Sequence, residues 1–173
     1  MYKKIMILGG SGSGKSTLAS KISLHTGHPV YHLDALFLHS NLEKKEKEKL
    51  EEVCRQFLSK DVGVVEGNYA NVLFLERAIW ADRIIFIDVS TRVQLYRVLR
   101  RMIRIIFGFE KRHGLPEGGR ERFSIPFLLW IYRWNKENKK KIFSLLNSVR
   151  DEKVTIINNP KKVDINELLN DKK

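Results

Sequence analysis

One stretch near the N-terminus restricts what this chain can fold into more than any other feature of its sequence. It follows a short apolar run, Lys4–Leu8, and reads Gly9-Gly10-Ser11-Gly12-Ser13-Gly14-Lys15-Ser16, with Thr17 next. The stretch fits the pattern G-x-x-x-x-G-K-[ST], and the segment after it, Lys15–His25, is compatible with a helix that ends at Gly27. A buried strand that leads through glycines directly into a helix is typical of parallel α/β proteins.

The residue types in this stretch predict a site for phosphate groups. Glycines let backbone N–H groups turn toward an anion that side chains would otherwise block, and the following helix points its N-terminus at the same place. We expect Lys15 to reach the β- and γ-phosphates, Ser16 to ligate Mg²⁺ and Thr17 to contact the α-phosphate. The predicted cofactors are therefore ATP and Mg²⁺, and the predicted nucleotide-binding residues are Gly9, Gly10, Ser11, Gly12, Ser13, Gly14, Lys15, Ser16 and Thr17. Residues Gly9 to Ser16 are called the phosphate loop below.

Strand-like and helix-like segments alternate along the rest of the chain. The predicted strands are Lys4–Leu8, Pro29–Leu33, Val62–Val65, Arg83–Asp88 and Val154–Ile157. The predicted helices are Lys15–His25, Leu42–Ser59, Ala70–Trp80, Thr91–Phe107, Ser124–Val149 (with a bend after Pro126) and Val163–Leu169. This alternation predicts a parallel α/β sheet of five strands with helices on both faces. The length of 173 residues is that of one domain, which we expect to span residues 1–173.

Three acidic residues stand where predicted strands end, at the edge of the sheet that also carries the phosphate loop. Asp34 follows the second strand, Glu66 the third and Asp88 the fourth. We expect Asp34 to accept or orient the proton of an attacking hydroxyl group, and Glu66 to hold Mg²⁺ through water. The simpler interpretation of each is a helix cap or turn residue, and for Asp88 we favour a cap on the helix that begins near Thr91.

The positive charge of the chain is concentrated in one segment. The net charge is +12 at pH 7, and residues Thr91–Lys141 contain 14 basic and 4 acidic side chains. A segment of this kind attracts polyanions, which could be nucleotide phosphates, nucleic acid or an acidic membrane surface.

Within this segment, four arginines fall on one face of the predicted helix Thr91–Phe107, at positions i, i+3, i+4 and i+7. Like charges on one stripe repel each other, so an anion in front of them would explain the arrangement. We expect Arg97 and Arg101 to contact the nucleotide, and Arg101 and Arg104 to act in catalysis. The opposite, apolar face is predicted to pack on the sheet. The stripe consists of Arg97, Arg100, Arg101 and Arg104, and the apolar face of Leu95, Val98, Leu99, Met102 and Ile106.

Composition excludes several other classes of protein. With 43% apolar and 30% charged residues, the chain is not wholly disordered. Its longest apolar runs are far shorter than the roughly 20 residues of a membrane span, and its start lacks the pattern of a signal peptide, so we expect a cytoplasmic protein without membrane contact. The single cysteine, Cys54, excludes an intramolecular disulfide and a multi-cysteine zinc site. The five histidines lack metal-ligand spacing and are interpreted as structural or surface residues.

Taken together, these residues resemble a known family. The phosphate loop, His32-Leu33-Asp34, Glu66-Gly67-Asn68-Tyr69 and the arginine-rich segment Arg97–Arg122 are similar to the adenylate-kinase-related P-loop proteins of bacteria. Many of these are labelled DNA topology modulation proteins (the FlaR-type group). The resemblance covers nearly the whole chain.

The resemblance implies a P-loop NTPase fold like that of the nucleoside monophosphate kinases, with ATP and Mg²⁺, a helical acceptor-binding region at residues 35–60 and a lid at 108–122. It aligns Glu66 with an acid that is usually aspartate, and it places Asn159-Pro160 near the adenine base. Relatives often have tryptophan-rich sequence after His-Leu-Asp, whereas this chain has Ala35-Leu36-Phe37-Leu38-His39, so the acceptor is not identified. From the residues alone, 108–122 is interpreted as a mobile lid with further arginines, or as a basic solvated loop.

The leading hypothesis is transfer of the γ-phosphoryl group from ATP–Mg²⁺ to an unidentified small molecule, with Lys15, Asp34, Glu66, Arg101 and Arg104 as the catalytic residues. Between Ala35 and Trp80 the only arginines are Arg55 and Arg77, and Asp34 stands at the acceptor entrance, so a hydroxyl acceptor is favoured over a phosphate. Two alternatives stay open: an ATPase switch, and a nucleotide-dependent DNA-binding protein whose binding would weaken steeply with salt. The oligomeric state is left open.

Overall fold

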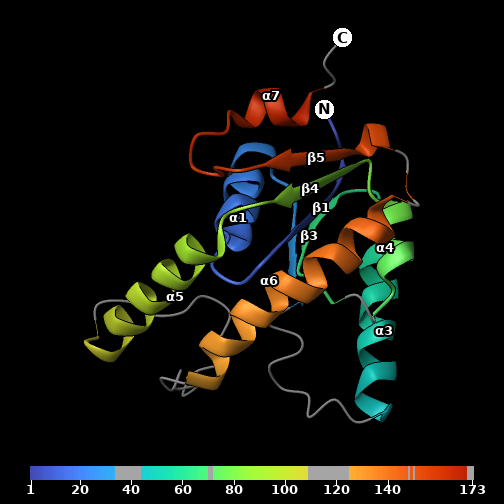
Figure 1. The fold of residues 1–173 in the computed structure, drawn as a ribbon. Coiled ribbons are helices and arrows are strands. Elements are labelled where there is room, and N and C mark those ends of the chain that lie inside the picture. Colours follow the sequence, from blue (N-terminus) through green and yellow to red (C-terminus); the bar gives the residue numbers. More distant parts are fainter. Residues whose placement is uncertain (34–43, 70–71, 109–124, 148, 150, 171–173) are drawn as a thin grey trace.

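The computed structural model describes residues 1–33, 44–69, 72–108, 125–147, 149 and 151–170 (Figure 1). Its strands are β1 (Lys4–Gly9), β2 (Val30–His32), β3 (Gly63–Glu66), β4 (Arg83–Ile87) and β5 (Val154–Ile157). Its helices are α1 (Lys15–Thr26), α3 (Lys44–Leu58), α4 (Phe74–Trp80), α5 (Thr91–Ile106), α6 (Ile125–Leu146) and α7 (Ile165–Leu169), with a short 3₁₀ helix at Asp151–Lys153.

The strands form one five-stranded sheet in the order β2-β3-β1-β4-β5, and every neighbouring pair is parallel. The predicted five-stranded parallel sheet is therefore confirmed. Strand β1 lies at its centre, between β3 and β4, so the phosphate loop leaves the middle of the carboxyl edge. This position brings the ends of β3 and β4 to either side of the loop.

Alternation along the strands places an apolar core on each face of the sheet. On one face, Met6, Leu8 and Phe86 pack with α3, α4 and α6; on the other, Ile5, Ile7 and Ile85 pack with α1 and α7. Successive side chains of a strand point to opposite faces, so strands that are apolar throughout must be covered on both sides. Figure 1 shows these helices on the two sides of the sheet, as predicted.

Helix α5 departs from the prediction that its apolar face packs on the sheet. Its buried residues Val98 and Met102 instead form a small core with Ile131 of α6, while Leu99 is 38% and Ile106 60% exposed. Figure 1 shows α5 extending away from the carboxyl edge, so its apolar stripe meets α6 rather than the strands. An amphipathic pattern shows that one face is covered, but it does not show by what.

The ends of two other helices also differ from the prediction. Helix α4 begins at Phe74 rather than at residue 70, because Leu73 has a left-handed φ of 44° that interrupts the helix. No bend follows Pro126: α6 is one helix from Ile125, and a proline in the first turn removes no helical hydrogen bond. Of the two tryptophans in α6, Trp134 is buried but Trp130 is 48% exposed.

Cys54 lies on α3 in the core beneath the sheet, fully buried, and this burial raises the pKa of its thiol. A buried thiol whose pKa is raised is a poor nucleophile. In the described part of the chain, none of the helices combines the length and the apolar character needed to cross a membrane. Residues 35–43 of the predicted acceptor-binding region and 109–122 of the predicted lid lie outside the described residues.

Candidate active site

The phosphate loop joins the last residue of β1 to the first residue of α1. Gly14 is the N-cap of α1, with a left-handed φ of 106° that a side chain would strain, and it has no side chain to bond the first amides of the helix. Amides at such a helix end have no partner within the helix and carry the positive end of its dipole. The start of α1 is therefore open to an anion in the way that the sequence predicts.

The outer side of the loop is pressed against α5. A Cβ atom at Gly12 would lie 2.7 Å from the backbone oxygen of Gln94 and 2.9 Å from a methyl group of Val98. Since backbone cannot give way, only glycine fits here, and the loop and the first turns of α5 are in direct contact. Arg97 strengthens this contact, donating to the carbonyl oxygens of Gly12 at 3.4 Å and Ser13 at 3.0 Å.

Gln94 links the loop to α6 as well. Its amide group exchanges two hydrogen bonds with Asn135, both of 3.1 Å, and also donates to the Val89 carbonyl at 2.6 Å. Gln94 is buried and lies against Gly10, where an added Cβ would fall within 2.1 Å of its side-chain oxygen. Neither Gln94 nor Asn135 stands out in the sequence, because the contact joins residues 41 positions apart.

Lys15 lies inside the loop rather than in solvent. The residue is 7% exposed, and its ammonium group donates to the Gly10 carbonyl at 3.3 Å, next to the backbone hydrogen bond from Ser13 to the same oxygen. Ser13 is fully buried, and its hydroxyl oxygen makes no hydrogen bond among the described residues. Buried polar groups of this kind are costly unless a partner is present, which fits a loop built to surround an anion.

Glu66, at the end of β3, is the acid nearest to the loop. It is 1% exposed, and its Oε1 accepts hydrogen bonds from Ser16 Oγ at 3.1 Å and from His32 Nδ1 at 2.8 Å. Its other oxygen, Oε2, is buried and has no hydrogen bond within the described part of the chain. The predicted metal residues Ser16 and Glu66 are thus in direct contact. The sequence interpretation missed His32, which was assigned a structural or surface role.

The carboxyl group of Glu66 is held in its charged form. Burial alone would raise the pKa of Glu66, but the hydrogen bond from His32, the positive charge of Lys15 and the bond from Ser16 outweigh it, so the pKa lies below its usual value. Glu66 is therefore a carboxylate at neutral pH.

This set of groups fits a magnesium ion. Mg²⁺ binds hard oxygen ligands and usually keeps several waters and substrate phosphates beside one or two protein groups. Ser16 and Glu66 offer such oxygens, and the partnerless Oε2 of a buried carboxylate is a ready ligand. The described residues contain no cluster of three or more histidine, cysteine or acidic side chains that could hold a metal, so a site here would depend on the nucleotide for its other ligands.

The turn after β3 is braced by a buried arginine. Arg77 of α4 is fully buried and donates to the carbonyl oxygens of Val72 (3.1 Å), Gly67 (3.1 Å), Asn68 (3.3 Å) and Tyr69 (2.7 Å). Burial lowers its pKa to about 10, which leaves it protonated at neutral pH.

Asn68 links the turn after β3 to the phosphate loop. Its side-chain oxygen accepts from the Gly9 amide at 3.0 Å, and its amide nitrogen donates to the Gly9 carbonyl at 2.8 Å. Arg77 thus holds the turn, and the turn holds the first residue of the loop. Arg77 is one of the two arginines between Ala35 and Trp80, and its burial and its bonds to carbonyl groups leave it unavailable to a phosphate acceptor.

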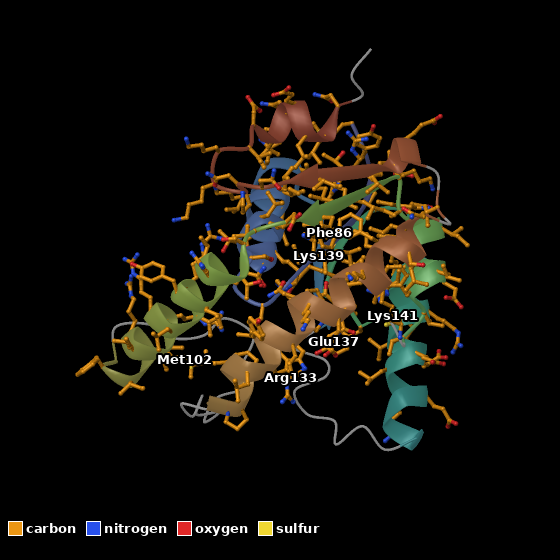
Figure 2. The ribbon with its side chains drawn as sticks, in the orientation of Figure 1. Phe86, Met102, Arg133, Glu137, Lys139 and Lys141 are labelled. Carbon is orange, nitrogen blue, oxygen red and sulfur yellow. The ribbon has the colours of Figure 1, made fainter. Side chains whose placement is uncertain are left out.

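Asp88 does not cap α5, whose N-cap residue is Ser90. The carboxylate instead pairs with Lys139 of α6, whose ammonium group lies 2.7 and 2.8 Å from its two oxygens. Figure 2 shows Lys139 on the side of α6 toward Phe86 of the sheet, whereas Arg133 and Lys141 are on the other side. The other lysines of this helix, Lys136, Lys140 and Lys141, are exposed.

The structure describes some of the remaining predicted site residues and not others. Arg101 is half-buried and Arg104 is exposed on α5, and their action on phosphate stays a prediction. Pro160 is buried beside Gly14, at the loop. Asp34 lies outside the described residues, although the preceding Leu33 is fully buried.

Comparison with known proteins bears on the fold. The sequence matches no protein-family model and no curated protein. Among solved structures, it is similar to a shikimate kinase from Bacteroides thetaiotaomicron, with a TM-score of 0.54 and 16% identity over 98% of this chain and 95% of that one. The fold is that of a P-loop kinase. A gluconokinase from Sinorhizobium meliloti 1021 also matches, with a TM-score of 0.49 and 17% identity over 96% of this chain and 87% of the other.

Replacing Arg77 should destabilise the protein strongly. In Arg77→Met, four carbonyl groups lose a buried donor, and we expect the free energy of unfolding in urea to fall by about 3 kcal/mol or more. Arg55→Met, on the exposed side of α3, is the control and should change it by less than about 0.5 kcal/mol. A loss below about 1 kcal/mol in Arg77→Met would show that the brace is not needed.

Acid should remove the stability that Glu66 contributes. Because its folded pKa is lowered, this contribution is complete above the unfolded pKa of about 4.3 and is lost as the pH falls through the folded pKa. The wild-type protein should therefore lose stability relative to Glu66→Gln between about pH 5 and pH 3, measured by urea unfolding. Glu76→Gln, at an exposed position of α4, should not show this trend, and a gain of wild-type stability over Glu66→Gln on acidification would contradict the assignment.

Proposed function

We propose that this protein is an ATP-dependent kinase that transfers the γ-phosphoryl group to a hydroxyl group of a small molecule. The observation that carries the proposal is the convergence of the phosphate loop, the buried Lys15 and the Ser16–Glu66 pair at the carboxyl edge of β1 and β3. Phosphoryl transfer depends on positioning and on stabilising negative charge, and this edge supplies groups for both.

The residues would divide this work among them. The amides at the start of α1 and the charge of Lys15 would hold the β- and γ-phosphates, while Ser16 and Glu66 would hold Mg²⁺, which neutralises charge on the phosphates when bound. Arg97 keeps the loop in its shape by donating to the carbonyl oxygens of its outer side. Asp34 would accept or orient the hydroxyl proton of the acceptor.

The described residues favour a hydroxyl acceptor over a phosphate acceptor. A phosphate acceptor needs cations of its own, and the arginines between Ala35 and Trp80 are not available for one. Arg77 is buried and bonded to carbonyl groups, and Arg55 lies on the exposed side of α3, 3.5 Å from Glu51. Kinases of this fold include one named for shikimate, a small-molecule acceptor.

We also propose that the protein belongs to the FlaR-type group and acts in the cytoplasm. We do not propose DNA binding as its main role. Two cations of the basic segment act within the protein: Arg97 bonds the phosphate loop and Lys139 pairs with Asp88. The charge of the segment therefore serves in part to hold α5 and α6 at the nucleotide site.

Removing the charge of Lys15 should abolish tight binding of the triphosphate. We expect calorimetric titration with ATP and Mg²⁺ to show clear binding to the wild-type protein and at least about tenfold weaker binding to Lys15→Ala, since a charge-assisted hydrogen bond to phosphate is worth about 1.5–3 kcal/mol. Lys21→Ala, an exposed position on the same helix, is the control and should bind as the wild type does. Absence of heat with the wild-type protein would refute nucleotide binding altogether.

A screen of acceptors should decide the chemistry. With ATP–Mg²⁺ and panels of nucleosides, sugars, other polyols and nucleoside monophosphates, we expect ADP release with a hydroxyl compound that is not a nucleotide. Turnover of nucleoside monophosphates alone would reverse the preference for a hydroxyl acceptor. With the acceptor found, Asp34→Asn should lower kcat by about a hundredfold or more and leave ATP binding intact. Asp61→Asn, whose side chain is 95% exposed, is the matched control.

A further inference from the structure

His32 and Glu66 stand directly opposite each other in neighbouring strands. They are partners in the parallel register of β2 and β3, and His32 Nδ1 lies 2.8 Å from Glu66 Oε1. The strands also hold this end of the sheet closely together, since a Cβ atom at Gly67 would lie 2.8 Å from the Cβ of the buried Leu33. The histidine ring and the carboxylate therefore have little freedom to separate.

The hydrogen bonds at this carboxylate are unequally distributed. Oε1 accepts from both His32 Nδ1 and Ser16 Oγ, while Oε2 is buried and has no hydrogen bond from any described residue. An ionised carboxylate only accepts, so the network assigns a proton to Nδ1 of the imidazole. Two donors on Oε1 fix the rotation of the carboxyl group and leave Oε2 available to a ligand.

We propose that His32 is a positioning residue for the magnesium site: its Nδ1–H holds Glu66 in the one orientation that leaves Oε2 for the ion. This inference rests on the proposed function, because it concerns the ion that accompanies the nucleotide. Hydrogen bonds to a ligating carboxylate orient it and tune its affinity, and removing such a partner usually weakens metal binding about tenfold to a hundredfold.

The different exposure of the two side chains indicates that His32 acts by hydrogen bonding rather than by packing. Glu66 has a side chain that is 1% exposed, whereas the side chain of His32 is 37% exposed, so the ring contributes modest apolar burial. Loss of the ring would leave the carboxylate with a single hydrogen bond, from Ser16, in a buried position. The pKa of Glu66, lowered in part by His32, agrees with this dependence.

The experiment compares nucleotide binding with and without the metal. Calorimetry gives the dissociation constant of a non-hydrolysable ATP analogue in MgCl₂ and in EDTA, and the ratio of the two measures how strongly the ion supports binding. Three variants are compared with the wild type: His32→Leu, which lacks the donor; His32→Asn, whose amide can replace Nδ1–H; and His25→Leu, an exposed histidine at the end of α1.

In His32→Leu we expect the metal effect to fall about tenfold or more, with binding in EDTA unchanged. In His32→Asn and His25→Leu the ratio should stay close to that of the wild type. An unchanged ratio in His32→Leu would overturn the inference, and so would equal losses in MgCl₂ and EDTA, which would indicate a distorted loop. A loss in His32→Asn as large as in His32→Leu would exclude the hydrogen bond as the cause.

The same data separate this inference from the proposed function. If the wild-type protein binds the analogue equally well in MgCl₂ and EDTA, the magnesium site itself is refuted. If it binds in neither, nucleotide binding is refuted. If the wild type shows a clear metal effect and His32→Leu retains it, the inference about His32 alone fails.

Discussion

The structure depends on holding a short glycine loop with its backbone amides turned to one side. A loop of this kind has no side chains to pack, so neighbouring elements must keep it in shape, and the loss of conformational entropy at glycine makes that support necessary. Here the support comes from two directions. The turn after β3 bonds Gly9 through Asn68, and α5 bonds the outer carbonyl groups of the loop through Arg97.

Each buried charge near the loop has a specific means of compensation. Lys15 donates to a loop carbonyl, Glu66 accepts from Ser16 and His32, and Arg77 donates to carbonyl groups alone. An unpaired charge in such surroundings would change its protonation or destabilise the fold. The hydrogen bonds of Arg77 stabilise structure, whereas the Oε2 atom of Glu66 and the hydroxyl of Ser13 remain without partners in the described structure. These two atoms lie in the phosphate loop and at the end of β3, where we propose that the nucleotide and its metal ion bind.

Side-chain contacts attach helices α5 and α6 to each other and to the carboxyl edge of the sheet. Gln94 and Asn135 join the two helices beneath Gly10, and Lys139 ties α6 to Asp88 at the end of β4. Both contacts lie close to the carboxyl edge, so the start of α5 and the middle of α6 are fixed with respect to the phosphate loop. Two basic residues of these helices are thereby held at this edge, Arg97 at the phosphate loop and Lys139 at the end of β4.

Local features of the sequence predicted the strands, the loop and most helices, because each depends on neighbouring residues: apolar runs, glycines and a helical spacing of side chains. Proximity of Ser16 and Glu66 also followed, since parallel strands share an edge. The structural roles of Arg77 and Asn68 were not predicted, because their partners depend on the packing of α4 against the end of β3.

The sequence by itself determined that a strand would lead through a glycine turn into a helix N-terminus, the arrangement expected to bind phosphate, because that arrangement is built within a few consecutive residues. Only the tertiary structure decided that β1 lies at the centre of the sheet, that α5 packs on α6, and that His32 shares an oxygen of Glu66 with Ser16. These depend on the order of strands and on contacts between distant residues, which no local pattern specifies.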